Sequence, residues 1–458
     1  MNLFNIDTLS PGSHIHFIGI GGISMSGIAQ IMLKNGYKVT GSDRCDSNIT
    51  EKLKELGATI YIGHQENNVT GADLVVYTAA VHGDNPEIIA SKKLGITLID
   101  RAECLGAIMK KYSHRIGVAG THGKTTTTSM IAHALIYAEL DPTISIGGEL
   151  DLIDGNIKTG SEEYFVTEAC EYTNSYHKFC PSIAIITNVE EDHLDFFKDI
   201  DDIIESFRKY ALLTKNGGHT IVWGEDENIK KVLENTDLDV ITYGMEGCDY
   251  SAENIIYVDG YPMFDCIEKD KKLCSLKLNV PGEHNILNAL ATVALCRLLG
   301  ADMDKSVKGI ESFKGTHRRF EKKGFCNGAV VIDDYAHHPT EIKATLSAAA
   351  SMPHTKITCI FEPHTYTRTK ALWDEFLESF VLADEIILSD IYAARELPDG
   401  TTTSEALAEA MAKKGLNAKY IKGFANIVDY VKNTAVKGDI IFTMGAGTVT
   451  QLGPMICD

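Results

Sequence analysis

Short apolar runs alternate with stretches of helical spacing over residues 14 to 110. "HIHFIGI" is typical of a buried strand and residues 24 to 35 of a helix, and further strands are expected at "KVTGSD", "DLVVYTAA" and "GITLID". Strands that alternate with helices in this way indicate βαβ units and a parallel sheet.

The same alternation returns in two later blocks. The second begins with "RIGVAG", a glycine-rich turn and a helix from Lys124, and its further strands are "EYFVTEA" and "SIAIITN". Residues 238 to 280 read as short antiparallel strands, and a helix at "EHNILNALATVALCRLLG" follows. The third block has strands at "AVVIDDYA", "KITCIFEP", "EIILSD" and "DIIFTMGAG", with helices from Pro339, near 370 to 382 and from Ser404.

These blocks predict an α/β protein with three domains in series, with limits 1–112, 113–314 and 315–458. The first and last are expected to be Rossmann-like, and the central one P-loop ATPase-like with a mainly parallel sheet. In such sheets ligands bind beyond the carboxyl ends of the strands and in clefts between domains.

Composition narrows the class of protein. The chain has 458 residues, 44% of them hydrophobic and 23% charged, as in soluble globular proteins. No apolar run approaches the ~20 residues of a membrane span, and no signal-peptide pattern opens the chain, so we expect a cytoplasmic protein. Eleven scattered cysteines without a C-x-x-C pair argue against a disulfide framework. A net charge of −20 disfavours nucleic-acid and membrane partners.

The segment "GVAGTHGKTTTT" resembles a Walker A loop with altered spacing. The standard motif has a glycine six positions before its lysine, where Val118 stands here. A strand, a glycine turn and Lys124-Thr125 at a helix start still favour phosphate binding, with Lys124 at the β and γ phosphates and Thr125 on Mg²⁺. A purely structural turn is the alternative.

The segment "GIGGIS" follows the first strand and opens a helix, and Asp43 ends the next strand. Glycines there would let a diphosphate approach the helix N-terminus. Ser24 occupies the last position of the dinucleotide fingerprint, where Gly or Ala is expected. The pattern therefore favours a nucleotide diphosphate without establishing NAD, and a structural turn stays open.

Polar side chains gather at other predicted strand ends and loops. One group could bind a metal ion, and consists of Glu168, Glu171, Asn188, Asp192, His193 and Asp195. Asn285 and Asn288 share a helical face and could pair with adenine, or could cap the helix. The third block contributes Arg318, Arg319, Asp333, Asp334, Tyr335, His337, His338, His364 and Arg368, among which an arginine could recognise a carboxylate. Each of these could also be structural.

In their order along nearly the whole chain, the motifs resemble the Mur ligase family of ATP-dependent amino-acid ligases of peptidoglycan synthesis. They are "HFIGIGGISMSGIA", "GTHGKTTT", "EACEYTNSY", "TNVEEDHLD", "PGEHNILNAL", "GTHRRFE", "DDYAHHPTE", "FEPHTYTR" and "MGAG". The family's loop, GTxGK[TS], matches residues 120–125 fully, so the absent Walker glycine is a family trait. An ungapped offset from His193 places Arg208 where sister ligases carry a carbamylated lysine, which fits the alanine-adding branch.

The resemblance implies ligation of L-alanine to the lactyl carboxylate of UDP-N-acetylmuramic acid, with ATP and Mg²⁺, or Mn²⁺, as cofactors. The carboxylate would attack the γ-phosphorus of ATP, and the alanine amine would then attack the resulting acyl phosphate. The protein is expected to be a monomer or a homodimer.

The family's site residues carry over to matching positions. The UDP-sugar site would comprise Gly19, Gly21, Gly22, Ser24 and Asp43. The nucleotide site would comprise Gly120, Thr121, His122, Gly123, Lys124, Thr125, Thr126, Asn285, Asn288, Arg319 and Asp334. The metal ligands would be Thr125, Glu168 and His193, and the amino acid would meet Tyr335, His337 and Arg368. The catalytic set would be Lys124, Glu168, His193, Arg319 and His337. Within this set His337 is a candidate proton acceptor.

Two positions depart from the family pattern, and three other functions stay open. Ser24 stands where a glycine is common, and Thr365 where some members have arginine, so the amino-acid carboxylate would depend more on Arg368. The alternatives are a recycling ligase that attaches a preformed tripeptide, an NAD-dependent oxidoreductase and a non-catalytic nucleotide-binding module.

Overall fold

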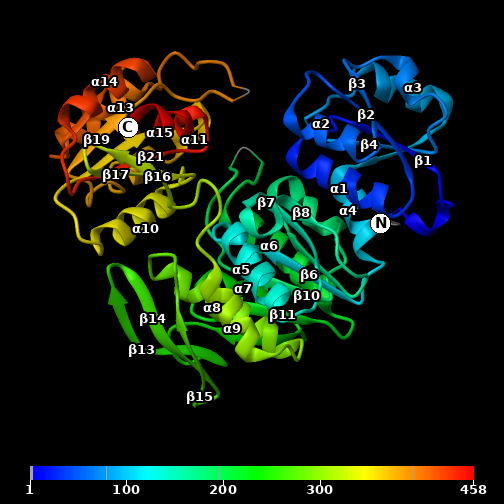
Figure 1. Ribbon diagram of the computed structural model, residues 1–458, viewed down its shortest axis with the longest axis horizontal. Helices are drawn as coiled ribbons and strands as arrows, with labels where there is room; N and C mark the ends of the chain where they lie inside the picture. The colour runs from blue at the N-terminus through cyan, green and yellow to red at the C-terminus, as the bar shows by residue number, and fades with distance from the viewer. Residues whose placement is uncertain (1–3, 79, 195, 395, 458) are drawn as a thin grey trace. The chain divides into compact units, whose positions relative to one another are not determined.

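The computed structural model describes residues 4–78, 80–194, 196–394 and 396–457 (Figure 1). Contacts divide the chain into two compact units, Met1–Thr242 with Ala294–Ser306 and Tyr243–Val293 with Val307–Asp458. Helices accompany three sheets in a three-domain α/β fold with mostly parallel strands, which confirms the predicted fold class. The domain limits given above stay a prediction.

The N-terminal sheet is parallel, with strand order β3-β2-β1-β4-β5. All of β1 is buried, including its two histidines, His14 and His16, whose rings each hydrogen-bond with the Thr40 hydroxyl. The order reverses beside β1, so the turn after β1 lies at the switch point where such sheets bind ligands. The strands are β1 His14–Ile18, β2 Lys38–Asp43, β3 Thr59–Ile62, β4 Leu74–Tyr77 and β5 Thr97–Asp100, and the helices are α1 Ile23–Lys34, α2 Asn48–Glu55, α3 Pro86–Leu94 and α4 Arg101–Met109.

The central sheet of the first unit has the order β11-β10-β6-β9-β7-β8 and is parallel except for β7 with β8. Its strands are β6 His114–Ala119, β7 Thr143–Leu150, β8 Gly155–Lys158, β9 Tyr164–Glu168, β10 Ile183–Ile186 and β11 His219–Trp223, and β12 Asp239–Tyr243 follows. The helices are α5 Lys124–Tyr137, α6 Ile200–Ala211 and α7 Glu227–Leu233. A buried core continues from Phe17 in β1 to Phe165 in β9 and Phe207 in α6, so it joins both sheets.

The second unit contains an antiparallel meander, which confirms the prediction for most of residues 238 to 280, but β12 at the start of that range pairs parallel with β13, so the prediction was wrong there. The meander comprises β13 Tyr250–Val258, β14 Tyr261–Glu268 and β15 Lys271–Lys277, and α8 His284–Leu298 and α9 Met303–Ser312 follow along the chain. The last sheet has the order β16-β17-β21-β18-β19-β20, and among its described residues β16 pairs antiparallel with β17 while the other neighbours are parallel. Its strands are β16 Glu321–Cys326, β17 Ala329–Asp334, β18 Ile357–Phe361, β19 Glu385–Leu388, β20 Ala418–Tyr420 and β21 Ile440–Met444.

The helices of this last domain differ from the prediction at one place. Two short helices, α11 Tyr366–Ala371 and α12 Trp373–Phe376, replace the helix predicted near 370 to 382. Leu372 between them leaves the helical region, with φ −102° and ψ 25°, so the prediction was wrong there. The other helices are α10 Pro339–Ala350, α13 Ser404–Lys413, α14 Phe424–Thr434 and α15 Leu452–Ile456.

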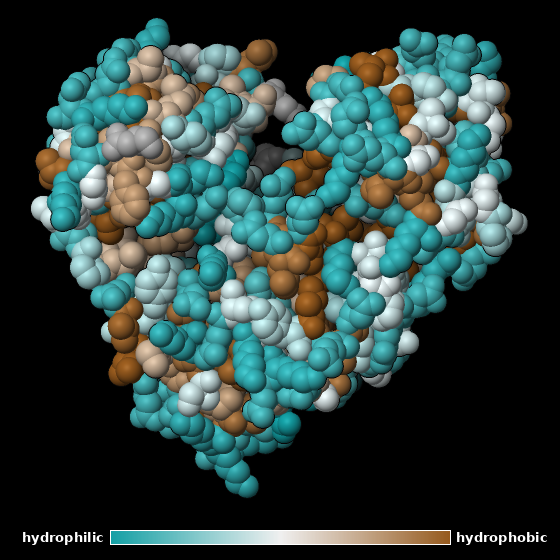
Figure 2. All heavy atoms as spheres, in the orientation of Figure 1, coloured by the Kyte–Doolittle hydropathy of each residue, from teal (hydrophilic) through white to brown (hydrophobic). Residues whose placement is uncertain are grey.

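The face of the molecule in Figure 2 is mainly hydrophilic, with smaller hydrophobic patches. Among the residues that the structure describes, no helix combines the length and the apolar character that crossing a membrane requires.

Candidate active site

The predicted phosphate loop connects β6 to α5 and is held against the segment that follows β10. The backbone amide of Thr121 donates to the carbonyl of Asn188 at 3.1 Å, and that of His122 donates to its side-chain oxygen at 2.8 Å. Gly120 has φ +139°, and a Cβ there would lie 1.9 Å from the hydroxyl oxygen of Thr187. Only glycine therefore allows this approach. Val118 lies inside β6 with no exposed surface, so the shorter loop needs no glycine at that position.

Lys124 begins α5 and points back to its own loop. Its ammonium donates to the carbonyls of Gly120 and Thr121. It also donates to both carboxylate oxygens of Glu171, and each of these two oxygens is 3.1 Å away. Burial alone would lower the pKa of Lys124, but Glu171 above all, with Cys170 and Glu168, raises it to about 12. The lysine is therefore a permanent cation at the loop.

Thr125 and Glu168 form a second contact beside the loop. The Thr125 hydroxyl donates to Glu168 at 3.1 Å, and the other Glu168 oxygen accepts from the amide of Gly147 at 2.6 Å. Hydroxyl and carboxylate oxygens are the ligands that Mg²⁺ prefers, so this pair fits a divalent cation that also binds phosphate oxygens. Thr126 follows in the first turn of α5 and is half-buried.

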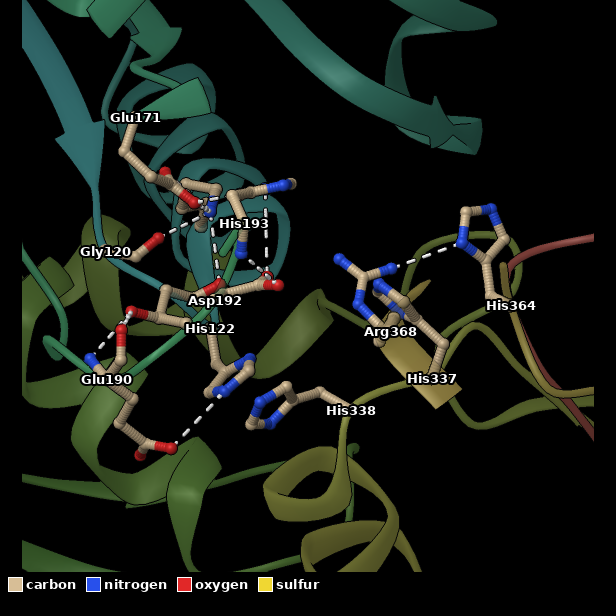
Figure 3. Close-up of polar contacts among 12 residues, drawn as sticks. Gly120, His122, Glu171, Glu190, Asp192, His193, His337, His338, His364 and Arg368 are labelled. Atoms are coloured by element: carbon tan, nitrogen blue, oxygen red, sulfur yellow. Dashed lines mark hydrogen bonds and ion pairs between the residues drawn. The ribbon is translucent and has the colours of Figure 1, made fainter. Parts of the chain in front are cut away.

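His193 lies on the same side of the loop. Its Nε2 is 3.8 Å from Oε1 of Glu171 and 3.7 Å from Oδ2 of Asp192, and its ring centroid is 4.6 Å from that of Tyr172. Figure 3 shows Glu171, Asp192 and His193 gathered beside Gly120. The backbone of His193 has φ +52°. Asp195, another candidate, lies outside the described residues.

The glycine turn after β1 is held by β2. The amides of Gly19 and Ile20 donate to the Ser42 carbonyl, and the amide of Gly21 donates to Asp43 at 2.8 Å. Gly22 is the N-cap of α1 and has an extended backbone, with φ −65° and ψ 140°. Asp43 thus supports the turn that the sequence predicted for a diphosphate.

Ser24 occupies the first turn of α1 and accepts a hydrogen bond of 2.8 Å from Nη1 of Arg101. Arg101 is the first residue of α4, and among the described residues it has no carboxylate within ion-pair distance. Sequence reasoning missed Arg101, because no local pattern near residue 101 indicates that its side chain reaches the glycine turn.

A buried network below this turn was also missed. Glu87 is fully buried and accepts hydrogen bonds from Ser42 and Asn68, each 2.6 Å long, while His64 lies 2.9 Å from it. Burial would raise the pKa of Glu87, but His16, with Nε2 3.6 Å away, and hydrogen bonds from Ser42 and Asn68 lower it to about 2. The ionised carboxylate therefore anchors Ser42, whose carbonyl holds the glycine turn.

In the second unit, Asn285 and Asn288 lie together on α8 as predicted. Asn288 donates to the side-chain oxygen of Asn285 at 3.0 Å, and Asn285 donates to the Pro281 carbonyl at 2.7 Å. Both are 6% exposed. α8 begins at His284, so neither asparagine precedes it as an N-cap.

Adjacent arginines have different surroundings in this unit. Arg318 donates to the carbonyls of Gly445 and Gly447, which ties it to the "MGAG" turn. Arg319 lies 3.6 Å from Glu341, and its guanidinium is 5.0 Å from the ring centroid of Tyr335. Arg318 is therefore structural, while Arg319 remains a candidate.

Asp334 ends β17 and is 6% exposed. It accepts hydrogen bonds from the amides of Phe320 and Ala336 at 2.8 and 2.7 Å. Burial raises the pKa of Asp334 to about 6, against the opposing effect of Arg319. This carboxyl group can therefore change its protonation near neutral pH.

The histidines that follow have distinct positions. His337 Nδ1 lies 3.1 Å from Glu341, whereas His338 caps α10 and accepts from the amide of Thr340. Arg368 lies in α11, with Nη1 3.2 Å from Nδ1 of His364. Thr365, the departure from the family pattern, is the N-cap of α11 and accepts from the amide of Arg368. The rings of His337 and His364 lie close together, with their centroids 5.7 Å apart.

Three family descriptions match successive parts of the chain. They are "Mur ligase family, catalytic domain" at residues 14–113, "Mur ligase middle domain" at 118–296 and "Mur ligase, glutamate ligase domain" at 318–447.

Similar curated proteins and solved structures point to the same family as these three matches. A UDP-N-acetylmuramate–L-alanine ligase of Clostridium botulinum is 52% identical over 445 residues, 96% of this chain and 97% of the relative. One from Clostridium tetani is 50% identical over 452 residues, 98% and 99% of the two chains. The structure of a UDP-N-acetylmuramate–alanine ligase from Thermotoga maritima has a TM-score of 0.80 at 30% identity, and covers 97% of this chain and 98% of its own. The chain therefore belongs to the Mur ligase family.

Proposed function

We propose that this protein joins L-alanine to the lactyl carboxylate of UDP-N-acetylmuramic acid, with ATP converted to ADP and phosphate. The observation that carries the proposal is about 50% identity, over almost the full length of both chains, to ligases named for this reaction. The loop supports the proposal, because the Thr125 hydroxyl and the Glu168 carboxylate offer the ligands that Mg²⁺ prefers, and the Lys124 ammonium lies in the same loop.

The first step is attack of the lactyl carboxylate on the γ-phosphorus, which gives an acyl phosphate and ADP. Oxide is a poor leaving group and phosphate a good one, so activation makes the carbonyl open to attack by the alanine amine. Lys124, a permanent cation at the loop, stabilises the charge that develops on the transferring phosphoryl group. Thr125, Glu168 and His193 would hold Mg²⁺, which would neutralise further phosphate charge.

Other residues take their roles from the family motifs. In the first unit the turn of Gly19, Gly21 and Gly22, with Asp43, binds the UDP moiety. In the second unit the nucleotide meets Asn285, Asn288, Arg319 and Asp334, and the amino acid meets Tyr335, His337 and Arg368. His337 is the candidate to accept the proton from the amine, since its Nδ1 lies beside Glu341.

The test is phosphate release with ATP, Mg²⁺ and UDP-N-acetylmuramic acid while the acceptor is varied among L-alanine, glycine and the tripeptide. We expect release that requires the UDP-sugar and is fastest with L-alanine. Release that ignores the UDP-sugar would overturn the proposal.

A tripeptide-attaching ligase is the second candidate. A murein peptide ligase from Psychrobacter arcticus has a TM-score of 0.70 at 26% identity, and covers 97% of this chain and 98% of its own. Faster turnover with tripeptide than with L-alanine would favour it. The higher identity to the alanine ligases supports L-alanine as the acceptor. No observation favours an oxidoreductase or a non-catalytic module.

A further inference from the structure

The phosphate-binding lysine is already held by acceptors of the protein. Lys124 donates to the carbonyls of Gly120 and Thr121 and to both oxygens of Glu171. An ammonium has three donor hydrogens. The lysine therefore has no donor to spare for a phosphate while these contacts last.

Glu171 is built into this position. It lies three residues after the end of β9 and is 3% exposed. Its backbone carbonyl accepts from the amide of Asn174, in a turn where Thr173 and Asn174 both have φ +56°. A buried carboxylate is costly unless it is paired, and Lys124 supplies the pairing charge.

One of the two Glu171 oxygens that contact Lys124 is also close to another potential metal ligand. Oε1 of Glu171 lies 3.8 Å from Nε2 of His193. A carboxylate oxygen and an imidazole nitrogen at this separation can bind one cation between them, because each would need to be only about 2.0–2.2 Å from the ion. Glu171 thus stands between a lysine suited to phosphate and a histidine suited to metal.

We propose that Glu171 is the resident counter-ion of Lys124, and that nucleotide binds by exchange: the phosphates take Lys124 while the accompanying divalent cation takes Glu171. The inference rests on the proposed function of the loop as a nucleotide site. Metal-free ATP would take the ammonium from Glu171 and leave this buried side chain beside the phosphates without its counter-ion. The metal removes that cost, so metal and nucleotide strengthen each other's binding, and by linkage they do so equally.

The test is calorimetric titration of ATP into the full-length protein, with Mg²⁺ and with a chelator, for wild type and Glu171→Gln. We expect Glu171→Gln to bind metal-free ATP about 10-fold more tightly than wild type and to gain less from Mg²⁺, within the usual range of such couplings. Glu171→Asp, which keeps the charge, should lie between them and serves if the glutamine variant does not fold.

Glu168→Gln is the matched control, since it removes one charge beside the same loop at a carboxylate that accepts hydrogen bonds from Thr125 and Gly147. It should tighten metal-free ATP binding less than Glu171→Gln does. Equal effects of the two variants would mean that Glu171 acts on ATP only through general charge repulsion, and would overturn the proposal.

A second readout separates an ion pair from a structural role. The pKa of the Lys124 ammonium, followed by nitrogen NMR with Lys124→Arg for assignment, should fall in Glu171→Gln. An unchanged pKa would also overturn the proposal. Absence of ATP binding by every variant, even with Mg²⁺, would instead reject the proposed function of the loop.

Discussion

Nη1 of Arg101 donates a hydrogen bond of 2.8 Å to the hydroxyl of Ser24. Ser24 is the residue that departs from the glycine common in the family, and the contact joins the first turn of α1 to the first turn of α4. The hydroxyl therefore positions a cation at the turn where we place the diphosphate of the UDP-sugar.

Ser24→Ala should weaken binding of the UDP-sugar about 10-fold, the lower end of what one hydrogen bond to a charged group contributes. ATP binding should not change. Titration calorimetry with each ligand measures both affinities. Ser26→Ala is the control, because its hydroxyl is also in α1 but bonds the carbonyl of Ile23. Equal losses in the two variants would show that Arg101 is not involved.

Thr125→Val should weaken Mg²⁺ binding in the presence of ATP by at least about 10-fold, as loss of a ligand or its support does. The reason is that the variant keeps the shape of the side chain and removes the hydroxyl that contacts Glu168. Turnover measured over a range of Mg²⁺ concentrations gives the affinity. Thr125→Ser keeps the hydroxyl and should behave as wild type; a weakened serine variant would contradict a metal role.

Arg368→Lys should raise the KM for L-alanine about 10-fold, because lysine cannot form the two parallel hydrogen bonds that guanidinium makes with a carboxylate. The KM for ATP should change little. Steady-state kinetics with each substrate varied in turn separates the two effects. Arg44→Lys, at an exposed position of the N-terminal domain, provides the control. A selective rise in the KM for ATP would place Arg368 elsewhere.

The free energy of unfolding should decrease as the pH falls from about 6.5 to about 4. His133 in α5 is 7% exposed, and burial lowers its pKa to about 4. The unfolded chain takes up a proton at His133 below pH 6.5 that the folded chain resists, so stability is complete above this window and is lost on acidification.

His133→Gln removes this proton and should retain about 3 kcal/mol more of its own neutral-pH stability at pH 4 than wild type does. Urea unfolding at a series of pH values measures the difference. His354→Gln, on the surface, should keep the wild-type pH dependence. Identical slopes for His133→Gln and wild type would refute the assignment.

Local pattern was sufficient for most of the elements that carry the site. The apolar run before Gly120 and the Lys-Thr pair after it predicted β6, the loop and α5 with an error of about one residue. The two asparagines predicted on one helical face are hydrogen-bonded to each other. These features depend on residues within a few positions of each other.

Contacts between distant positions could not be predicted in this way. Arg101 and Ser24 are 77 residues apart, and Lys124 and Glu171 are 47 apart. The segment "EACE" does not distinguish its two glutamates, yet Glu168 contacts Thr125 and Glu171 contacts Lys124. Arg318 and Arg319 are adjacent and of one residue type, so the sequence did not indicate that Arg318 donates to the Gly445 carbonyl.

The sequence by itself determined the α/β class, the two glycine turns and the types of residue that surround them, because strand and helix periodicity and turn chemistry are local properties. Only the tertiary structure decided which carboxylate holds Lys124, which arginine serves the fold and what Ser24 contacts. The physical reason is that these pairings depend on the order of the parallel strands in each sheet, which brings together residues that are distant in the sequence. Charges and hydrogen bonds act between groups that are close in space, and local sequence patterns do not specify which distant groups become close.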